Sequence, residues 1–207
     1  MKDFKVYLVS GNKRKAEEFL RILDGKLNIE LVDIDLPEIQ GSPEEITIYK
    51  CKSAYERING PVFVEDTSLC FNAYNGLPGP YVKWFLKSVG AQGLFNMLQG
   101  YQDKSAYAMT LIGYFDGSSM SEPIIFQGRI DGEIVKPSGE KGFSWDPIFK
   151  PNGYNATDRF PTRSKSRLEQ GCVSLRGSEN RRSLWVAPGR SQPQQLPQSA
   201  LQCQTES

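Results

Sequence analysis

The sequence predicts a mixed α/β fold built on a central sheet, with a β-rich second lobe. Strand-like and helix-like stretches alternate over residues 1–160, and glycine, proline and asparagine separate them. The chain has 207 residues, 39% hydrophobic and 24% charged, which is the size and composition of a globular protein with a sizeable core. There is no internal repeat, and we expect residues 1–160 to form one folded core and residues 161–207 a divergent tail.

The first predicted unit is a short strand at residues 4–9, a polar turn and a helix at residues 17–23. A turn that opens a helix presents free backbone N–H groups and the positive end of the helix dipole, which together favour a phosphate. Three cations in the turn add to that charge, although basic residues in a first helical turn are also typical of a solvated face. The residues of this candidate phosphate turn are Ser10, Gly11, Asn12, Lys13, Arg14 and Lys15.

A second strand at residues 29–34 and a helix at residues 42–58 follow. Ser42 can cap this helix, Pro43 suits its first position, and Glu45 completes a capping box. The helix is expected to stop at the sequence Asn-Gly-Pro, residues 59–61, because glycine and proline end helices.

The third strand is predicted at residues 61–64, and it ends in the polar run Glu65, Asp66, Thr67 and Ser68. Ligands of open α/β sheets bind at the carboxyl ends of strands, so the two carboxylates should face a cleft. Beside a phosphate they would suit Mg²⁺, with Glu38 in the loop after the second strand as a third carboxylate. The alternative is that Glu65 and Asp66 only begin a turn or cap a helix.

The remaining elements are two helices and a pair of strands. A stiff turn at residues 77–80 leads to a short helix through residues 84–86, and another helix lies near residues 94–98. Residues 107–115 and 124–135 alternate as two strands of a hairpin-like pair.

An aromatic segment at residues 143–146 is a candidate base-binding element. Phe143 and Trp145 offer flat faces for stacking, and Asp146 can accept hydrogen bonds from a nucleobase. The alternative is that the aromatic rings belong to the core.

Composition excludes several kinds of chemistry. The chain has no histidine, which rules out Ser-His-Asp and Cys-His arrangements and any imidazole acid or base. The four cysteines include no Cys-x-x-Cys pair, and there is no membrane-length apolar run or signal-peptide pattern. We therefore expect reduced thiols and a cytoplasmic protein with no membrane partner.

From residue 161 onward the chain is rich in Ser, Gln, Arg and Pro, with seven basic residues against three acidic ones. Few apolar side chains are available there to offset the entropy of ordering, so we expect most of the tail to be disordered. A basic tail can bind nucleic acid through phosphates, but its single aromatic residue, Trp185, makes a nucleic-acid partner the less favoured hypothesis.

Together these motifs resemble the inosine triphosphate pyrophosphatase family, the Ham1-like non-canonical purine NTP pyrophosphatases. The matching stretches occur in the family's order and cover residues 4 to about 160. They are SGNKRK, LPEIQG, IYKCKSA, VFVEDTSLCFNAYNGLPGPYVKWFL, DKSAYA, GRIDGEIV and the run from GFSWDPIF to PNGY.

The resemblance implies an elongated fold in which a long mixed central sheet with flanking helices forms two lobes around a nucleotide cleft. It implies a catalytic core at residues 1–160, usually in a homodimer, that hydrolyses ITP, dITP or XTP to the monophosphate and pyrophosphate. Catalysis would be electrostatic, with a metal-oriented water.

The resemblance also implies roles for individual residues. Ser10 to Lys15 would cradle the triphosphate, and Glu38 and Asp66 would hold Mg²⁺, for which Mn²⁺ could substitute. Asp66 would act as base or positioner for the attacking water, with Glu65 in support. The nucleotide would be contacted by Lys50, Thr67 and Lys83, and its base pocket would be lined by Phe143, Ser144, Trp145 and Asp146.

Two departures from the family pattern bear on function. Ser144 stands where the family has glycine, which risks a clash, or backbone strain if this position needs a positive φ. After Phe160 the family continues with a lysine-bearing loop, a Ser-His-Arg motif and a closing helix, none of which is present. Residues 161–207 resemble an out-of-frame or alternatively spliced sequence. Two hypotheses follow: an active pyrophosphatase, or a catalytically impaired nucleotide-binding or dimerising variant.

Overall fold

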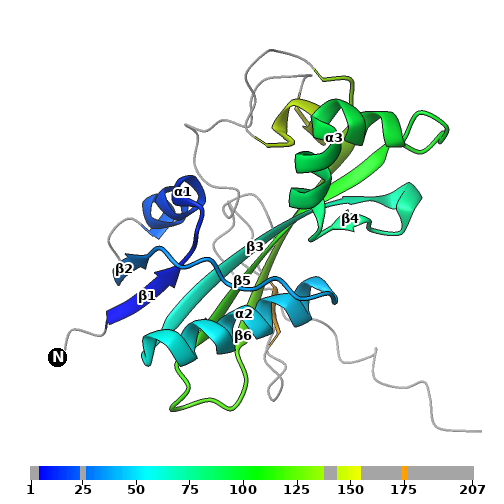
Figure 1. Ribbon diagram of the computed structural model, residues 1–207. Coiled ribbons are helices and arrows are strands. Elements are labelled where there is room, and N and C mark those ends of the chain that lie inside the picture. Colours follow the sequence, from blue (N-terminus) through cyan, green and yellow to red (C-terminus); the bar gives the residue numbers. More distant parts are fainter. Residues whose placement is uncertain (1–4, 24–26, 138–143, 155–173, 177–207) are drawn as a thin grey trace, which may run out of the picture.

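The computed structural model describes residues 5–23, 27–137, 144–154 and 174–176 (Figure 1). Their helices are α1 (Lys13–Leu23), α2 (Pro43–Ile58) and α3 (Val82–Met97), with 3-10 turns η1 (Asn72–Tyr74) and η2 (Asp146–Ile148). Their strands are β1 (Lys5–Val9), β2 (Asn28–Val32), β3 (Val62–Phe71), β4 (Pro78–Gly79), β5 (Ser105–Phe115), β6 (Ile124–Ile134), β7 (Phe149–Pro151) and β8 (Ser174–Arg176).

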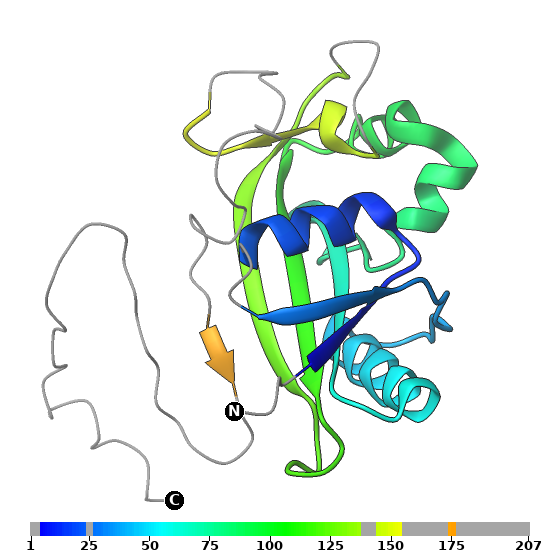
Figure 2. The ribbon, with the colours of Figure 1, turned by 90° about the vertical axis from the view of Figure 1, so that its left-hand side faces the viewer.

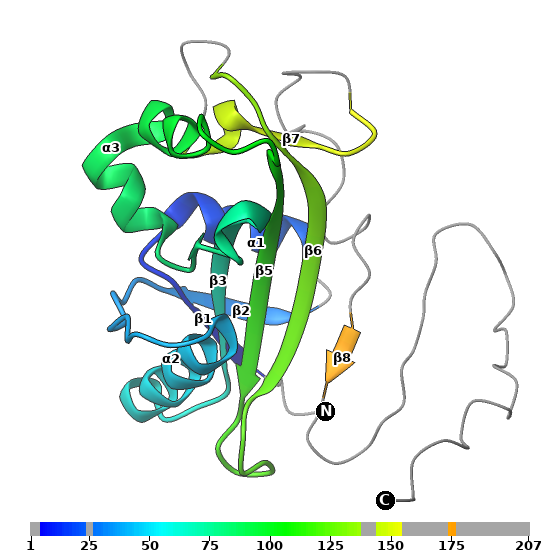
Figure 3. The same ribbon diagram turned by 90° about the vertical axis from the view of Figure 1, so that its right-hand side faces the viewer.

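One mixed sheet runs through the molecule in the order β2-β1-β3-β5-β6-β7, with β4 paired to β3 and β8 to β6. β1 is parallel to β2 and β3, and the other pairs are antiparallel. Helices α1 and α2 cover opposite faces of this sheet (Figures 2 and 3). The predicted α/β class with a mixed central sheet and flanking helices is therefore confirmed.

The core is divided into three apolar clusters along the long strands. Residues of α1 pack on Leu8 and Ile112, whereas residues of α2 pack on Val9 and Val64. A third cluster joins α3 and Ile148 of η2 to the far ends of β3 and β5. The long strands β3, β5 and β6 connect the α1–α2 lobe to the α3 lobe.

Local patterns in the sequence predicted the helices well. The capping box of α2 is present, since the Ser42 side chain accepts a hydrogen bond from the Glu45 N–H and the Glu45 side chain accepts one from the Ser42 N–H. α3 consists of two helical stretches on either side of Gly90, which has a φ of +67°, and this confirms the two predicted helices. α1 begins at Lys13, before the predicted start at residue 17.

The predicted end of the third strand near residue 64 is wrong. β3 continues to Phe71 because β5 pairs with it in antiparallel register along its whole length, from Val62 opposite Phe115 to Phe71 opposite Ala106. On its other side, β3 pairs with β1, and this parallel pairing ends where Val9 lies opposite Val64. Glu65 and Asp66 therefore lie inside β3, immediately beyond the end of β1.

Within the predicted tail, the structure describes β8, which pairs with Ile125 to Gln127 of β6. The other residues of the tail, for which we expect disorder, lie outside the residues that the structure describes. None of the described helices is long and apolar enough to cross a membrane.

Candidate active site

The carboxylates of Glu65 and Asp66 face opposite sides of the sheet. Successive side chains of a strand alternate between its faces. Glu65 contacts Lys15 of α1, and Asp66 contacts Lys50 of α2. The two carboxylates that are adjacent in the sequence thus belong to two different polar groups.

On the α2 face, one buried lysine joins two carboxylates. The Nζ of Lys50 donates to Oδ1 of Asp66 at 2.6 Å and to Oε1 of Glu38 at 3.4 Å. Lys83, on the first turn of α3, donates to the same Glu38 oxygen at 3.3 Å. The Lys50 and Asp66 side chains are only 9% and 12% exposed, so water screens this pair poorly.

Burial and charge move the pKa values of this group in different directions. Burial raises the pKa of the Asp66 carboxyl, and the opposing effect of Lys50 does not cancel it. Burial would lower the pKa of the Lys50 ammonium, but Asp66 and Glu38 together raise it. For Glu38, burial is outweighed by Lys50 and Lys83, and the pKa of this carboxyl falls below its usual value.

On the α1 face, Lys15 faces both carboxylate oxygens of Glu65, at 3.3 and 3.1 Å. Glu65 also accepts a hydrogen bond from the Thr67 hydroxyl, which lies 3.1 Å from the hydroxyl of Thr110 on β5. Sequence analysis missed Thr110, because only the pairing of β3 with β5 brings it to Thr67.

The candidate phosphate turn connects β1 to α1. Oγ of Ser10 accepts from the Asn12 N–H at 3.2 Å, and Oδ1 of Asn12 accepts from the Lys15 N–H at 3.3 Å. These bonds hold the first turn of α1, from which the Lys15 side chain reaches Glu65. The exposed residues of the turn are Gly11, Lys13 and Arg14.

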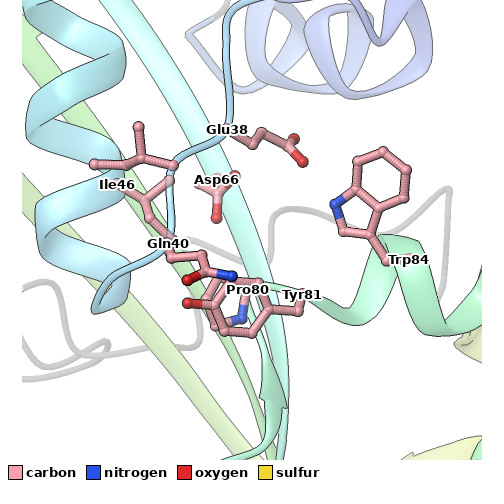
Figure 4. A pocket seen from close by; sticks show the side chains of 8 residues that line it. Glu38, Gln40, Ile46, Asp66, Pro80, Tyr81 and Trp84 are labelled. Carbon is pink, nitrogen blue, oxygen red and sulfur yellow. The ribbon is translucent and has the colours of Figure 1, made fainter.

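A pocket of about 240 Å³ opens where the two lobes meet. Glu38 and Asp66 face it from the loop before α2 and from β3, and Trp84 of α3 stands on the opposite side (Figure 4). Tyr81 also lines it, and sequence analysis assigned no role to either aromatic residue. The complete lining is Glu38, Ile39, Gln40, Ile46, Asp66, Pro80, Tyr81 and Trp84.

The predicted base-binding segment is only partly described, since Phe143 lies outside the described residues. Trp145 is 4% exposed and packs edge-to-face on Phe149 at 5.7 Å, so it belongs to the core, as the alternative interpretation proposed. Asp146 begins η2. Ser144 has a φ of +59°, the left-handed conformation that favours glycine.

The polar group on the α2 face fits a small, hard cation. Oδ2 of Asp66 is buried and has no hydrogen-bond partner among the described residues. Asp66 and Glu38 converge on one cation, the Lys50 ammonium, which shows that their oxygens can approach a shared positive charge. The described part of the chain contains no cluster of three acidic or cysteine side chains close enough to hold a metal. Mg²⁺ suits such a site because it takes one or two carboxylates and completes its shell with water and phosphate oxygens.

Comparisons with known proteins agree with this architecture. The model of the Ham1 family matches residues 6–171. The Ham1 protein of Staphylococcus aureus is 26% identical with a TM-score of 0.59, and the match covers 70% of this chain and 80% of that chain. The HAM1 protein of Coxiella burnetii is 26% identical with a TM-score of 0.62, covering 70% and 81%. A nucleoside-triphosphatase, or dITP/XTP pyrophosphatase, of Mycobacterium abscessus shares the fold at 23% identity and a TM-score of 0.60, covering 72% and 85%.

Proposed function

Because the chain belongs to the Ham1 family, we propose that it hydrolyses non-canonical purine nucleoside triphosphates such as ITP, dITP and XTP. Water attacks the α-phosphorus, the bond from that phosphorus to the bridging oxygen breaks, and monophosphate and pyrophosphate are released. The observation that carries the proposal is the buried pair of Lys50 and Asp66, which faces Glu38 at a pocket between the lobes.

Three lysines from different helices are proposed to bind the triphosphate, which would lie beyond the end of β1, where Lys15 on one face of the sheet and Lys50 on the other can both reach it. Lys15, Lys50 and Lys83 each pair with a carboxylate in the structure. A triphosphate carries more negative charge than the single carboxylate that each lysine now contacts, and lysine binds phosphate as a point charge. The N–H groups at the start of α1 would add to this attraction.

Glu38 and Asp66 are the proposed ligands for Mg²⁺, and Mn²⁺ could replace it. When bound, the cation would neutralise phosphate charge and lower the pKa of a water molecule. Asp66 is also the proposed base or positioner for the attacking water. Its Oδ1 is held by Lys50, and its buried Oδ2 has no hydrogen-bond partner among the described residues, so it is placed to accept a bond from the water.

Glu65 supports the site from the other face of the sheet. It holds Lys15 and is itself held by Thr67, so its proposed role is to orient that lysine. Thr67 remains a proposed nucleotide contact.

A catalytically impaired variant that binds nucleotide or dimerises is the second candidate. Ser144 favours it, because a serine at a φ of +59° strains the segment proposed to line the base pocket. The proposed pocket residues are Phe143, Ser144, Trp145 and Asp146. A homodimer and a cytoplasmic location remain proposals under both hypotheses.

The test is hydrolysis of ITP, dITP, XTP, ATP and GTP with Mg²⁺ in ¹⁸O-labelled water. The proposal expects pyrophosphate release and the label in the monophosphate, since the attack is on the α-phosphorus. Label in free phosphate would indicate a different phosphatase. Nucleotide binding by the folded chain without turnover would support the impaired variant.

A further inference from the structure

The segment that carries Glu38 has no regular secondary structure. Residues 33–42 connect β2 to α2. Within this segment, the carboxylate of Glu38 forms ion pairs with Lys50 and Lys83. A cation bound by Glu38 competes with both lysines for the same carboxylate. Before Glu38 the segment is held by Leu36, which packs on the cluster of Val9 and Val64. A contact after Glu38 would hold the segment from its other side when those ion pairs open.

Tyr81 makes such a contact with the main chain. Its hydroxyl donates to the carbonyl oxygen of Gly41 at 3.0 Å and accepts from the Gly41 N–H at 2.9 Å. A tyrosine hydroxyl has one donor and accepting lone pairs, so one oxygen satisfies both groups of the glycine. These bonds do not use the Glu38 carboxylate and would persist with a metal bound.

Both partners of this contact are themselves held firmly. The Tyr81 N–H donates to the carbonyl of Pro78 at 3.1 Å, and the Tyr81 carbonyl accepts from the Trp84 N–H at 2.9 Å. Gly41 precedes Ser42, the cap of α2, whose N–H is bound by Glu45 at 2.7 Å. Tyr81 thus joins the start of α3 to the start of α2 across the pocket.

We propose that Tyr81 is a positioning residue that holds Glu38 beside Asp66 for cation binding. The inference rests on the proposed function, since it takes Glu38 and Asp66 as the metal ligands. Groups that orient metal ligands typically change metal affinity by about 10–100-fold when they are removed. Tyr81→Phe keeps the ring and removes only the hydroxyl.

The experiment measures Mn²⁺ binding to the full chain by electron paramagnetic resonance, without nucleotide. Tyr81→Phe is expected to raise the dissociation constant about tenfold, and Tyr49→Phe, at an exposed tyrosine of α2, should leave it unchanged. In pyrophosphate release, the Tyr81→Phe enzyme should need more Mn²⁺ but recover its kcat at saturating Mn²⁺.

Equal Mn²⁺ affinities of the wild type and Tyr81→Phe would overturn the inference, and so would a wild type that binds no Mn²⁺. A loss of kcat at saturating Mn²⁺ with unchanged affinity would also overturn it. Failure of the proposed function looks different: Mn²⁺ binding that depends on Tyr81, in a chain that hydrolyses no triphosphate, would refute the enzyme and leave the positioning role of Tyr81 standing.

Discussion

In the phosphate half of the proposed site, Lys50 is buried between two carboxylates, whereas in the base half Ser144 is exposed and strained at a φ of +59°. The phosphate half consists of Lys15, Glu38, Lys50, Asp66 and Lys83, and each of them has an ionic partner. The base half is residues 143–146. In it, Trp145 belongs to the core, and Ser144 stands where the family has glycine. The difference suggests that hydrolysis and base discrimination depend on separate parts of the chain and can be altered separately.

The largest effect should come from Asp66→Asn. Asparagine keeps the shape but removes the proton acceptor, and a general base typically contributes about 10²–10⁴-fold to the rate. Pyrophosphate release should fall by that factor for ITP and GTP alike, while nucleotide binding measured by calorimetry persists. A variant that loses rate only for ITP would break the separation of the two halves.

Lys50→Met should have the next largest effect, because it leaves Asp66 buried without its cation. Breaking a buried pair costs about 3–5 kcal/mol of unfolding free energy. Since Lys50 lowers the pKa of Asp66, removing it raises that pKa further, and the acid limb of the kcat/KM profile should move to higher pH. The stability loss should shrink in acid, where Asp66 is protonated.

Urea unfolding from neutral to acidic pH checks the stability of Lys50→Met. Lys52→Met, at an exposed pair with Glu122, is the matched control and should change the unfolding free energy by less than about 1 kcal/mol. An acid limb that stays in place in Lys50→Met would argue against Asp66 as the titrating group.

Ser144→Gly tests the base half. Left-handed backbone costs a residue with a side chain about 1–2 kcal/mol, so the variant should unfold at a higher temperature. Ser88→Gly, inside the helical part of α3, should instead unfold at a lower temperature. If strain impairs base recognition, Ser144→Gly also raises the ratio of kcat/KM for ITP over GTP. An equal change in kcat for both substrates would show that Ser144 acts on hydrolysis, as the phosphate half does, and not on base recognition.

The smallest effect is expected from Thr110→Val, which removes the 3.1 Å contact to the Thr67 hydroxyl. One hydrogen bond contributes about 0.5–1.5 kcal/mol to stability, and urea unfolding can measure that loss. Thr110→Ser should restore it. If both variants match the wild type, the Thr67–Thr110 contact adds nothing to the support of Glu65 and Lys15.

Features that depend on neighbouring residues could be predicted from the sequence, and features that depend on distant pairing could not. The capping box of α2 spans four residues, so Ser42 and Glu45 identify it directly. The end of β3 at Phe71 depends on pairing with β5, which lies far along the chain. The residues near Glu65 contain no pattern that predicts this pairing.

The same distinction holds at the site. Glu38 and Asp66 were predicted as carboxylates that follow two strands, Lys50 came from the resemblance, and the structure brings the three together. The contact of Tyr81 with Gly41 joins residues 40 positions apart, and neither residue type indicates the other. Side chains alternate between the two faces of a strand, so the sequence could have placed Glu65 and Asp66 on opposite faces of the sheet. That prediction required the strand to continue past Val64.

The most direct test of the two-part site is pyrophosphate release by the wild-type chain with Mg²⁺, measured for ITP and GTP side by side. A complete phosphate half beside a strained base half predicts release from both nucleotides with little preference for ITP. A folded chain that releases pyrophosphate from ITP but not from GTP, or that binds either nucleotide and releases none, would contradict the account.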